Sequence, residues 1–229
     1  MADFLNTLVF GIYPYIALAV LALGSIIRYD REPYTWRSGS SQLLRRKQLI
    51  WGSVLFHVGI LVIFFGHLFG LLTPIEIFDW IGIGRGFKQM IAIVMGGTAG
   101  VIALVGATLL LHRRLFDVRI RATSSFADNW VLILLYLQLV LGLGTIFVSA
   151  QHLDGEEMVK FMSWARGIFT FQAGSADFVA EVHWIFKAHL FLGLTIFLLF
   201  PFTRLVHMLS APVRYVWRPG YQIVRSRNR

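Results

Sequence analysis

Four histidines lie within long apolar stretches of this chain, where ionisable side chains are rare. His57 and His67 share one stretch, and His189 and His207 share another. An ionisable group in the hydrocarbon of a membrane is costly unless it has a partner, so four imidazoles in two segments require one. A bound metal cofactor is a suitable partner because neutral imidazole is a common metal ligand.

The composition indicates an integral membrane protein. Hydrophobic residues make up 57% of the 229 residues, charged residues make up only 14%, and the mean hydropathy is +0.68. These values exclude an ordinary soluble domain. A helical span needs about 20 apolar residues. We therefore expect an all-α fold with five transmembrane helices, near residues 4–27, 49–72, 87–111, 127–148 and 182–209.

The first apolar run and the absence of cysteine restrict the interpretation further. The run follows a single acid, Asp3, without a basic leader or a cleavage site, so it is expected to remain as a span. The lack of cysteine excludes disulfides, iron–sulfur ligation by this chain and covalent attachment of c-type haem. Any metal centre must therefore use nitrogen or oxygen ligands.

The charges of the connecting segments predict how the spans are oriented. Segments 28–48 and 112–126 are rich in arginine and lysine, whereas segments 73–86 and 149–181 are mainly acidic. The positive-inside rule then places the N-terminus outside and the C-terminus, with a basic tail at 211–229, in the cytoplasm. The formal charge of +9 is explained by this topology and by anionic lipid, and no nucleic-acid-binding motif accompanies it.

This orientation arranges the histidines as two facing pairs. His57 and His207 lie toward the cytoplasm, and His67 and His189 lie toward the outside. At 1.5 Å per residue, about 15 Å separates the first two histidines along their helix and about 27 Å the last two, which share one face. The unequal rises require a helix crossing or tilted cofactors, and Pro201 is expected to kink the last span.

Two metal centres, each with two axial imidazoles, fit these pairs better than a tetrahedral zinc or copper site. Haem supplies four equatorial nitrogens, and iron with two histidine ligands favours electron transfer. The residues therefore predict two b haems, with His183 as a weaker rival to His189. Arg204, one turn before His207, either pairs with haem propionates or extends to the membrane interface.

Two further patterns concern packing. A stripe of glycines on the second span indicates close helix packing more strongly than a fit to porphyrin. A helix is also expected within the outer segment 149–181, and its spacing favours a helix lying at the membrane interface over one that covers an outer site. The glycines are Gly52, Gly59, Gly66 and Gly70, and the apolar face of the outer helix comprises Met158, Phe161, Met162, Ala165, Ile168 and Phe169.

Several short segments, taken together and in order, resemble the respiratory nitrate reductase gamma subunit, the membrane cytochrome b of that enzyme. The resemblance covers essentially the whole chain, residues 1–229, as one five-helix domain. The segments are Tyr13-Pro-Tyr15, Arg28-Tyr-Asp30, Tyr34-Thr-Trp-Arg37, His57-Val-Gly-Ile60, Gly66-His-Leu-Phe-Gly70, Arg113-Arg-Leu-Phe116, Gln151-His-Leu-Asp-Gly155 and Phe200-Pro-Phe-Thr-Arg-Leu-Val-His207.

The resemblance implies a bacterial inner-membrane subunit with two b haems, whose four ligands match the histidines named above. It also implies a quinol site at Lys88, at the outer start of the third span. Without the resemblance, a lysine that extends to water at the membrane interface explains this residue equally well. Electrons would pass inward to an iron–sulfur beta subunit and a molybdenum alpha subunit that reduces nitrate. The alternatives are a b-type subunit of another terminal reductase, and a haem-free transporter or anchor whose histidines relay protons or bind metal.

Overall fold

The computed structural model describes residues 2–36 and 44–210, and these residues form helices without a β-strand. Five stretches within them are long and apolar enough to cross a membrane, which confirms the five expected spans. They are Asp3–Arg31, Arg46–Leu72, Arg85–Phe116, Phe126–Ser149 and Trp184–Phe202. The basic tail expected at 211–229 lies outside the described residues.

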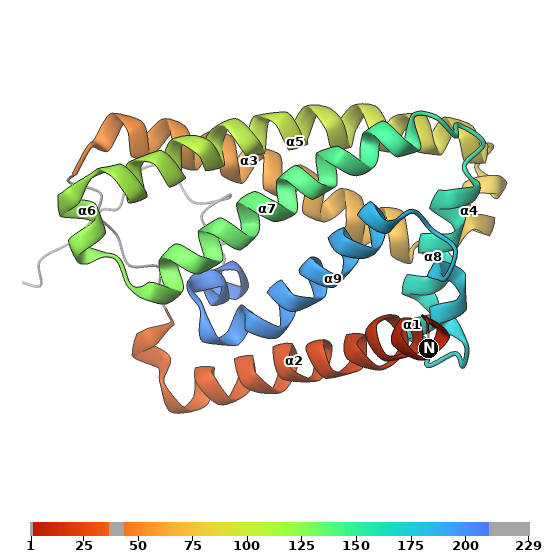
Figure 1. Ribbon diagram of the computed structural model, residues 1–229, viewed down its shortest axis with the longest axis horizontal. Coiled ribbons are helices and arrows are strands. Elements are labelled where there is room, and N and C mark those ends of the chain that lie inside the picture. The colour runs from red at the N-terminus through yellow and green to blue at the C-terminus, as the bar shows by residue number, and fades with distance from the viewer. Residues whose placement is uncertain (1, 37–43, 211–229) are drawn as a thin grey trace, which may run out of the picture.

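The spans and the shorter helices between them follow one another in the order shown in Figure 1. The first span comprises α1 (Ala2–Thr7), the π-helix η1 (Leu8–Ile12) and α2 (Tyr13–Arg31), and it is followed by η2 (Pro33–Thr35). The next elements are α3 (Arg46–Leu72), α4 (Ile75–Trp80), α5 (Arg85–Phe116), α6 (Val118–Thr123) and α7 (Phe126–Ser149). The last are α8 (Glu156–Phe169), η3 (Ser175–Val179), α9 (Trp184–Leu199), η4 (Phe200–Phe202) and η5 (Arg204–Ser210).

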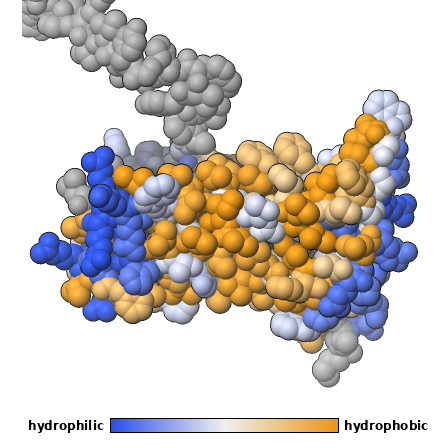
Figure 2. Space-filling model, turned by 90° about the horizontal axis from the view of Figure 1, so that it is seen from above, coloured by the Kyte–Doolittle hydropathy of each residue, from blue (hydrophilic) through white to orange (hydrophobic). Residues whose placement is uncertain are grey.

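The long helices lie side by side, with α4 and α8 at one end of the bundle and α6 at the other (Figure 1). The most extensive packing joins α3 to α5, α5 to α7, α7 to α9, and α9 to α2. Figure 2 shows that the surface between the two hydrophilic ends is largely hydrophobic. A bundle with this belt suits a bilayer, whose hydrocarbon core cannot satisfy exposed polar groups.

Glycines allow α3 and α5 to approach closely. Close packing was expected for the whole glycine stripe, and half of the stripe takes part in it. A Cβ at Gly59 would lie 2.5 Å from the backbone oxygen of Ala99, and one at Gly106 would lie 2.3 Å from the backbone nitrogen of Phe56. By contrast, a Cβ at Gly66 or Gly70 would meet nothing within 4 Å. Since a Cβ at Gly52 would also lie 3.1 Å from the side chain of Leu110, the packing explanation holds for the first two glycines of the stripe and not for the last two.

Pro14 explains both the π-helix in the first span and its link to α8. Proline has no N–H, so it leaves the carbonyl four residues earlier, that of Phe10, without its α-helical donor. The indole Nε1 of Trp164 in α8 donates to that oxygen at 2.8 Å. A buried apolar cluster that includes Phe10 and Trp164 surrounds the contact. The distortion in the first span therefore provides an anchor for α8.

The helix expected in the outer segment is present as α8, and it covers the end of the bundle. It packs against α3, α5 and η3. Met162, Ala165 and Ile168 of the expected apolar face are buried, whereas Phe169 is exposed. An interfacial helix would keep one face toward lipid, but the buried face of α8 contacts protein. The position of α8 therefore agrees with the covering role.

The fifth span departs from the prediction of one kinked helix over 182–209. The α-helix ends at Leu199, Pro201 lies in the 3-10 turn η4, and Thr203 is extended, with φ −120° and ψ 178°. The separate 3-10 segment η5 then carries His207. The expectation that His189 and His207 share one face of a continuous helix is therefore wrong. Pro201 ends the helix because its ring cannot fit the preceding turn.

Candidate functional site

The structure brings the four histidines together as two pairs. The ring centres of His57 and His207 lie 6.3 Å apart, and those of His67 and His189 lie 6.2 Å apart. His57 and His67 come from α3, whereas His189 belongs to α9 and His207 to η5. The extensive packing of α3 is against α5 and not against α9. The histidines thus face one another across the region between α3 and the last span.

The break after α9 resolves the unequal spacing of the histidines. A continuous helix would place His207 about 27 Å from His189, against about 15 Å between His57 and His67. Figure 1 shows that the chain turns away from the line of α9 at its end and folds back. This return brings His207 opposite His57 without the tilt that a straight helix would require.

The distances within the pairs fit one metal ion between each pair of rings. A metal–imidazole bond measures about 2 Å. In a five-membered ring with bonds of about 1.3 Å, each atom lies about 1.1 Å from the centre. Two imidazoles that share an ion on a common axis therefore have centres about 6 Å apart. Within the described residues no group of three potential metal ligands is found; haem iron, which has four ring nitrogens of its own, would need only the two imidazoles of each pair.

Backbone carbonyls set the tautomer of three of the four rings. Nδ1 of His57 lies 2.7 Å from the oxygen of Ser53, and Nδ1 of His67 lies 2.8 Å from that of Ile63. Nδ1 of His207 lies 2.5 Å from the oxygen of Arg204. A carbonyl oxygen only accepts, so Nδ1 must carry the proton and donate. Nε2 is then left with its lone pair, as metal ligation requires.

His189 is held by α7 in a different way. The amide nitrogen of Gln138 lies 3.3 Å from its Nε2 and donates to its backbone oxygen at 3.1 Å. Its Nδ1 is buried and has no hydrogen-bond partner in the described part of the chain. A Cβ at Gly142, one turn after Gln138, would lie 2.9 Å from the His189 ring. An orphaned ring nitrogen in this position fits a site that a metal completes.

Neither Gln138 nor Gly142 was predicted from the sequence as a site residue. A signal existed, because Gln138 is a polar residue inside an apolar span, and such residues commonly mark a site in membrane proteins. The expected rival ligand, His183, instead caps α9, and its Nδ1 accepts the N–H of Ile185 at 3.3 Å.

Lys88 lies at the α8 end of the bundle and is buried, with 7% of its surface exposed. Its Nζ donates to the backbone oxygen of Gly70 at 3.0 Å and to the sulfur of Met162 at 2.9 Å. It also lies 3.8 Å from the centre of the Phe78 ring, a cation–π distance. The explanation by an interfacial lysine that reaches for water is therefore wrong. Lys88 points inward, toward the helix end that carries His67.

Gln89 follows Lys88 in α5, and its side chain binds other elements than Lys88 does at this end of the bundle. Its side-chain amide donates to the backbone oxygens of Ser149, at 2.9 Å, and of His152. The two neighbours on α5 therefore join α3 and α8 on one side to the end of α7 on the other. Gln89 was not predicted from the sequence as a site residue.

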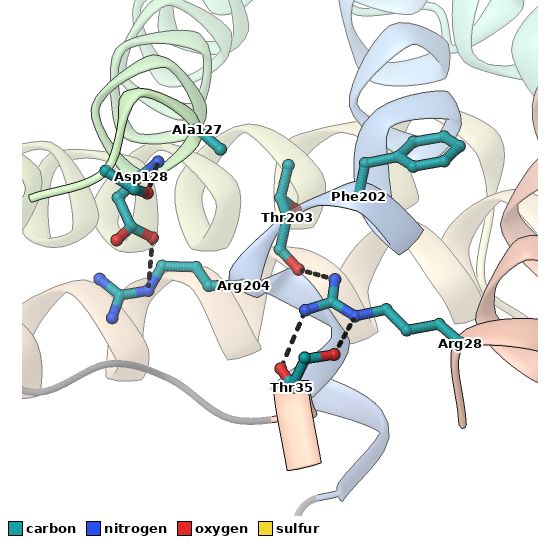
Figure 3. A pocket seen from close by; sticks show the side chains of 8 residues that line it. Arg28, Thr35, Ala127, Asp128, Phe202, Thr203 and Arg204 are labelled. Carbon is teal, nitrogen blue, oxygen red and sulfur yellow. Dashed lines mark hydrogen bonds and ion pairs between the residues drawn. The ribbon is translucent and has the colours of Figure 1, made fainter. Parts of the chain in front are cut away.

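Arg204 has a protein partner that the sequence analysis had not considered. Its Nε lies 3.3 Å from Oδ1 of Asp128 in α7, and Arg114 lies 4.0 Å from the other carboxylate oxygen. Figure 3 shows this ion pair beside a cavity of about 260 Å³. The cavity is also lined by Arg28 and Thr203. Charged side chains thus converge next to the segment that carries His207.

The fold and the histidines define a class of protein: a multi-pass helical membrane protein with two pairs of facing histidines inside the bundle. A comparison with protein families is more specific. Residues 6–227 match the model of the nitrate reductase gamma subunit. The chain belongs to this family, and it is therefore a membrane subunit of an oxidoreductase complex.

Similar proteins cover the full length of the chain. The respiratory nitrate reductase 1 and 2 gamma chains of Escherichia coli are 52% and 51% identical to it, over 99% of this chain and 100% of theirs. The nitrate reductase gamma chain of Bacillus subtilis is 37% identical, over 96% of this chain and 98% of its own. Five apolar helices and these relatives identify a multi-pass protein of the bacterial inner membrane.

Proposed function

We propose that this chain is the di-haem cytochrome b subunit of a respiratory nitrate reductase, and that it oxidises quinol near the outer face of the membrane. Electrons would pass inward to an iron–sulfur beta subunit, which feeds a molybdenum-containing alpha subunit that reduces nitrate. The observation that carries the proposal is the presence of two facing histidine pairs in a member of this family. The ring centres within the two pairs lie 6.3 and 6.2 Å apart.

His57 and His207 would hold the inner haem, and His67 and His189 the outer one. Two b haems, when bound, supply a one-electron relay across the membrane. The chain contributes the orientation of the rings, because the carbonyls of Ser53 and Ile63 keep Nε2 of the α3 histidines unprotonated. Arg204, fixed by Asp128, would direct positive charge toward the propionates of the inner haem.

The α8 end of the bundle would face the outside, and the α6 end, with the tail 211–229, would face the cytoplasm. The basic residues near α6 support this orientation through the positive-inside rule, since Arg113, Arg114, Arg119 and Arg121 lie there. In this orientation His67, Lys88 and α8 are on the outer side. The five helices would act as one domain, whose cytoplasmic face meets the beta subunit.

Lys88 would orient quinol beside the outer pair. Oxidation of quinol to quinone releases two electrons and two protons, and an ammonium group stabilises the negative charge that develops on oxygen as a proton leaves. In the structure this ammonium donates to Gly70 and Met162, and a quinol oxygen would accept its third N–H. Protons would leave on the outer side while electrons move inward, and this separation of charge conserves energy.

Haem quantification tests the proposal. A pyridine haemochrome assay on the purified complex should give about two b haems per chain, the number that two bis-histidine sites require. His67→Ala and His189→Ala should abolish the same centre in redox titrations, and His57→Ala and His207→Ala the other. His112→Ala, outside both pairs, is the control and should retain both centres. A haem-free wild-type protein, or loss of different centres by the two members of a pair, would refute the proposal.

The acceptor is tested separately. The native chain should co-purify with an iron–sulfur subunit and a molybdenum subunit, and quinol oxidation by the complex should depend on nitrate. Co-purification with another terminal reductase, and oxidation that depends on its acceptor, would support the alternative b-type subunit. That outcome would leave the haem assignments intact and change only the partner.

A further inference from the structure

The segment that carries His207 lacks the support of a regular helix. The extended residue Thr203 separates η5 from α9, and η5 itself is a 3-10 helix. Such helices have poor hydrogen-bond geometry and rarely run beyond four residues. An axial ligand on a seven-residue 3-10 segment therefore needs other elements to fix its position.

Arg28, near the C-terminal end of α2, binds the chain at this break. Its Nη1 donates to the backbone oxygens of Pro201, at 2.7 Å, and of Thr203, at 2.8 Å. Figure 3 shows this guanidinium between Thr203 and Thr35. The same group donates to Thr35 through Nε, at 3.2 Å to the hydroxyl, and through Nη2, at 2.9 Å to the backbone oxygen. Arg28 thus joins η2 to the carbonyls that the helix break exposes.

The close approach of α2 to the break depends on a glycine one turn before Arg28. A Cβ at Gly24 would lie 2.8 Å from Cγ of Pro201. The opposite end of η5 is held as well, because the indole Nε1 of Trp36 donates to the hydroxyl of Ser210. Between these two contacts, Leu205 and Val206 are buried in a cluster against which Trp36 packs. His207 therefore lies between two contacts made by the chain at the end of α2.

The arrangement is not a binding site for an anionic ligand. A guanidinium has five N–H donors, and the four hydrogen bonds given above use four of them. Their acceptors are all oxygens of this chain. Arg28 is thus a structural cross-link, although it borders the cavity of Figure 3.

We propose that Arg28, Thr35 and Trp36, which we name the α2 clasp, position His207 as an axial ligand of the inner haem. The inference rests on the proposed haem function and adds residues that contact neither haem nor quinol. The carbonyl of Arg204, which sets the tautomer of His207, follows Thr203 directly. A shift of the break would therefore move both the ring and the group that orients it.

Substitution of Arg28 in the complete complex tests the inference. Arg28→Gln should remove the bonds to Pro201 and Thr203. Loss of a residue that orients a metal ligand typically weakens metal retention about 10-fold to 100-fold, so the inner centre should be depleted or shifted in potential. The outer centre should keep its spectrum and potential. Arg28→Lys, with one point charge in place of a planar fork, should give an intermediate effect.

Matched variants separate positioning from general stability. Arg31→Gln removes an arginine from the same last turn of α2, at an exposed position, and should leave both centres unchanged. Trp36→Phe keeps an aromatic ring in this position and removes the five-membered ring that carries the indole donor, so it should affect the inner centre in the same direction as Arg28→Gln. Redox-monitored electron paramagnetic resonance and haem content give the readouts, and the thermal stability of the complex is measured alongside.

The outcomes distinguish this inference from the proposed function. If the wild-type complex contains no haem, the proposed function fails. If it contains two haems and Arg28→Gln matches Arg31→Gln in both potentials, the α2 clasp has no positioning role. Equal loss of both centres, with a fall in thermal stability, would also overturn the inference, since Arg28 would then support the bundle as a whole.

Discussion

A histidine that binds a metal must present the correct ring nitrogen, and here the helix backbone makes the choice. His57 and His67 each donate from Nδ1 to the carbonyl four residues earlier, that of Ser53 or Ile63. The apolar surroundings strengthen these bonds, because hydrocarbon offers no competing donor. The two histidines on α3, which we propose as ligands, are therefore oriented by the same helix that carries them.

Lys88 provides a residue-scale prediction for the quinol site. Lys88→Met should slow quinol oxidation by about 100-fold, the typical cost of removing one group that stabilises developing negative charge. The methionine side chain fills much of the same buried space, so haem content should be retained. Stopped-flow reduction of the cytochrome by a quinol analogue measures the rate.

Lys160 in α8 supplies the matched control. It is more exposed than Lys88 and forms an ion pair with Glu157 at 3.1 Å, an interaction of small energetic value at a surface. Lys160→Met should leave the rate of quinol oxidation unchanged. If Lys88→Met oxidises quinol as fast as Lys160→Met does, Lys88 has only a structural role under α8.

The sequence predicted the two facing pairs of histidines, whose role as ligands stays a prediction, but it did not predict their surroundings. The histidines were visible because a titratable group in an apolar run is costly wherever it points. Gln138, Gly142 and Arg28 act only through contacts with another span, and those contacts depend on which helices are neighbours. An arginine at the end of a span is normally explained by the positive-inside rule, so nothing in the sequence indicated that Arg28 would bind the carbonyls near Pro201.

At the scale of elements, the packing of α3 on α5 should decide whether both pairs form. A Cβ at Gly59 would meet backbone atoms of Ala99 and Ala103 at 2.5 and 2.6 Å, and backbone cannot move aside as a side chain can. Gly59→Ala should therefore destabilise the bundle by about 1–3 kcal/mol, the usual cost of overpacking. Thermal unfolding of the purified complex measures the effect. Because α3 carries one proposed ligand of each pair, the two proposed haems should be lost in parallel.

Gly96→Ala is the control for that prediction. Gly96 lies on α5, where an added Cβ would meet nothing within 4 Å. Alanine is the better helix former by about 1 kcal/mol, so this variant should be at least as stable as the wild type. A Gly59→Ala variant that matches Gly96→Ala in stability would show that the close approach of α3 and α5 is not required.

Hydropathy predicted where the spans lie but not how the last one ends. Residues 200–209 remain largely apolar, and an apolar run does not distinguish an α-helix from 3-10 turns. Pro201 marked the position of the disturbance, but proline can kink a helix as well as end one. In the structure the helix ends at this point, and Arg28 stabilises the end by donating hydrogen bonds to the carbonyls that it exposes.

At the scale of the whole molecule, the two ends of the bundle differ in charge, and this asymmetry should fix its orientation. The α6 end carries Arg45, Arg46 and Lys47 in addition to the arginines near α6, whereas acidic residues prevail around α4 and α8. Positively charged segments are retained in the cytoplasm during insertion. The quinol site at Lys88 would then face the outside, and the iron–sulfur subunit would meet the α6 end.

The absence of cysteine from the sequence makes this orientation directly measurable. Ala173→Cys, between α8 and η3, and Ala122→Cys, in α6, introduce single thiols at two exposed positions at opposite ends of the bundle. In spheroplasts, a membrane-impermeant maleimide should label Cys at position 173 and not at position 122. After permeabilisation both should react, which confirms that each thiol is accessible. Labelling of position 122 alone in spheroplasts would show the opposite topology, with quinol oxidation on the cytoplasmic side. Proton release on that side could not add to the membrane potential.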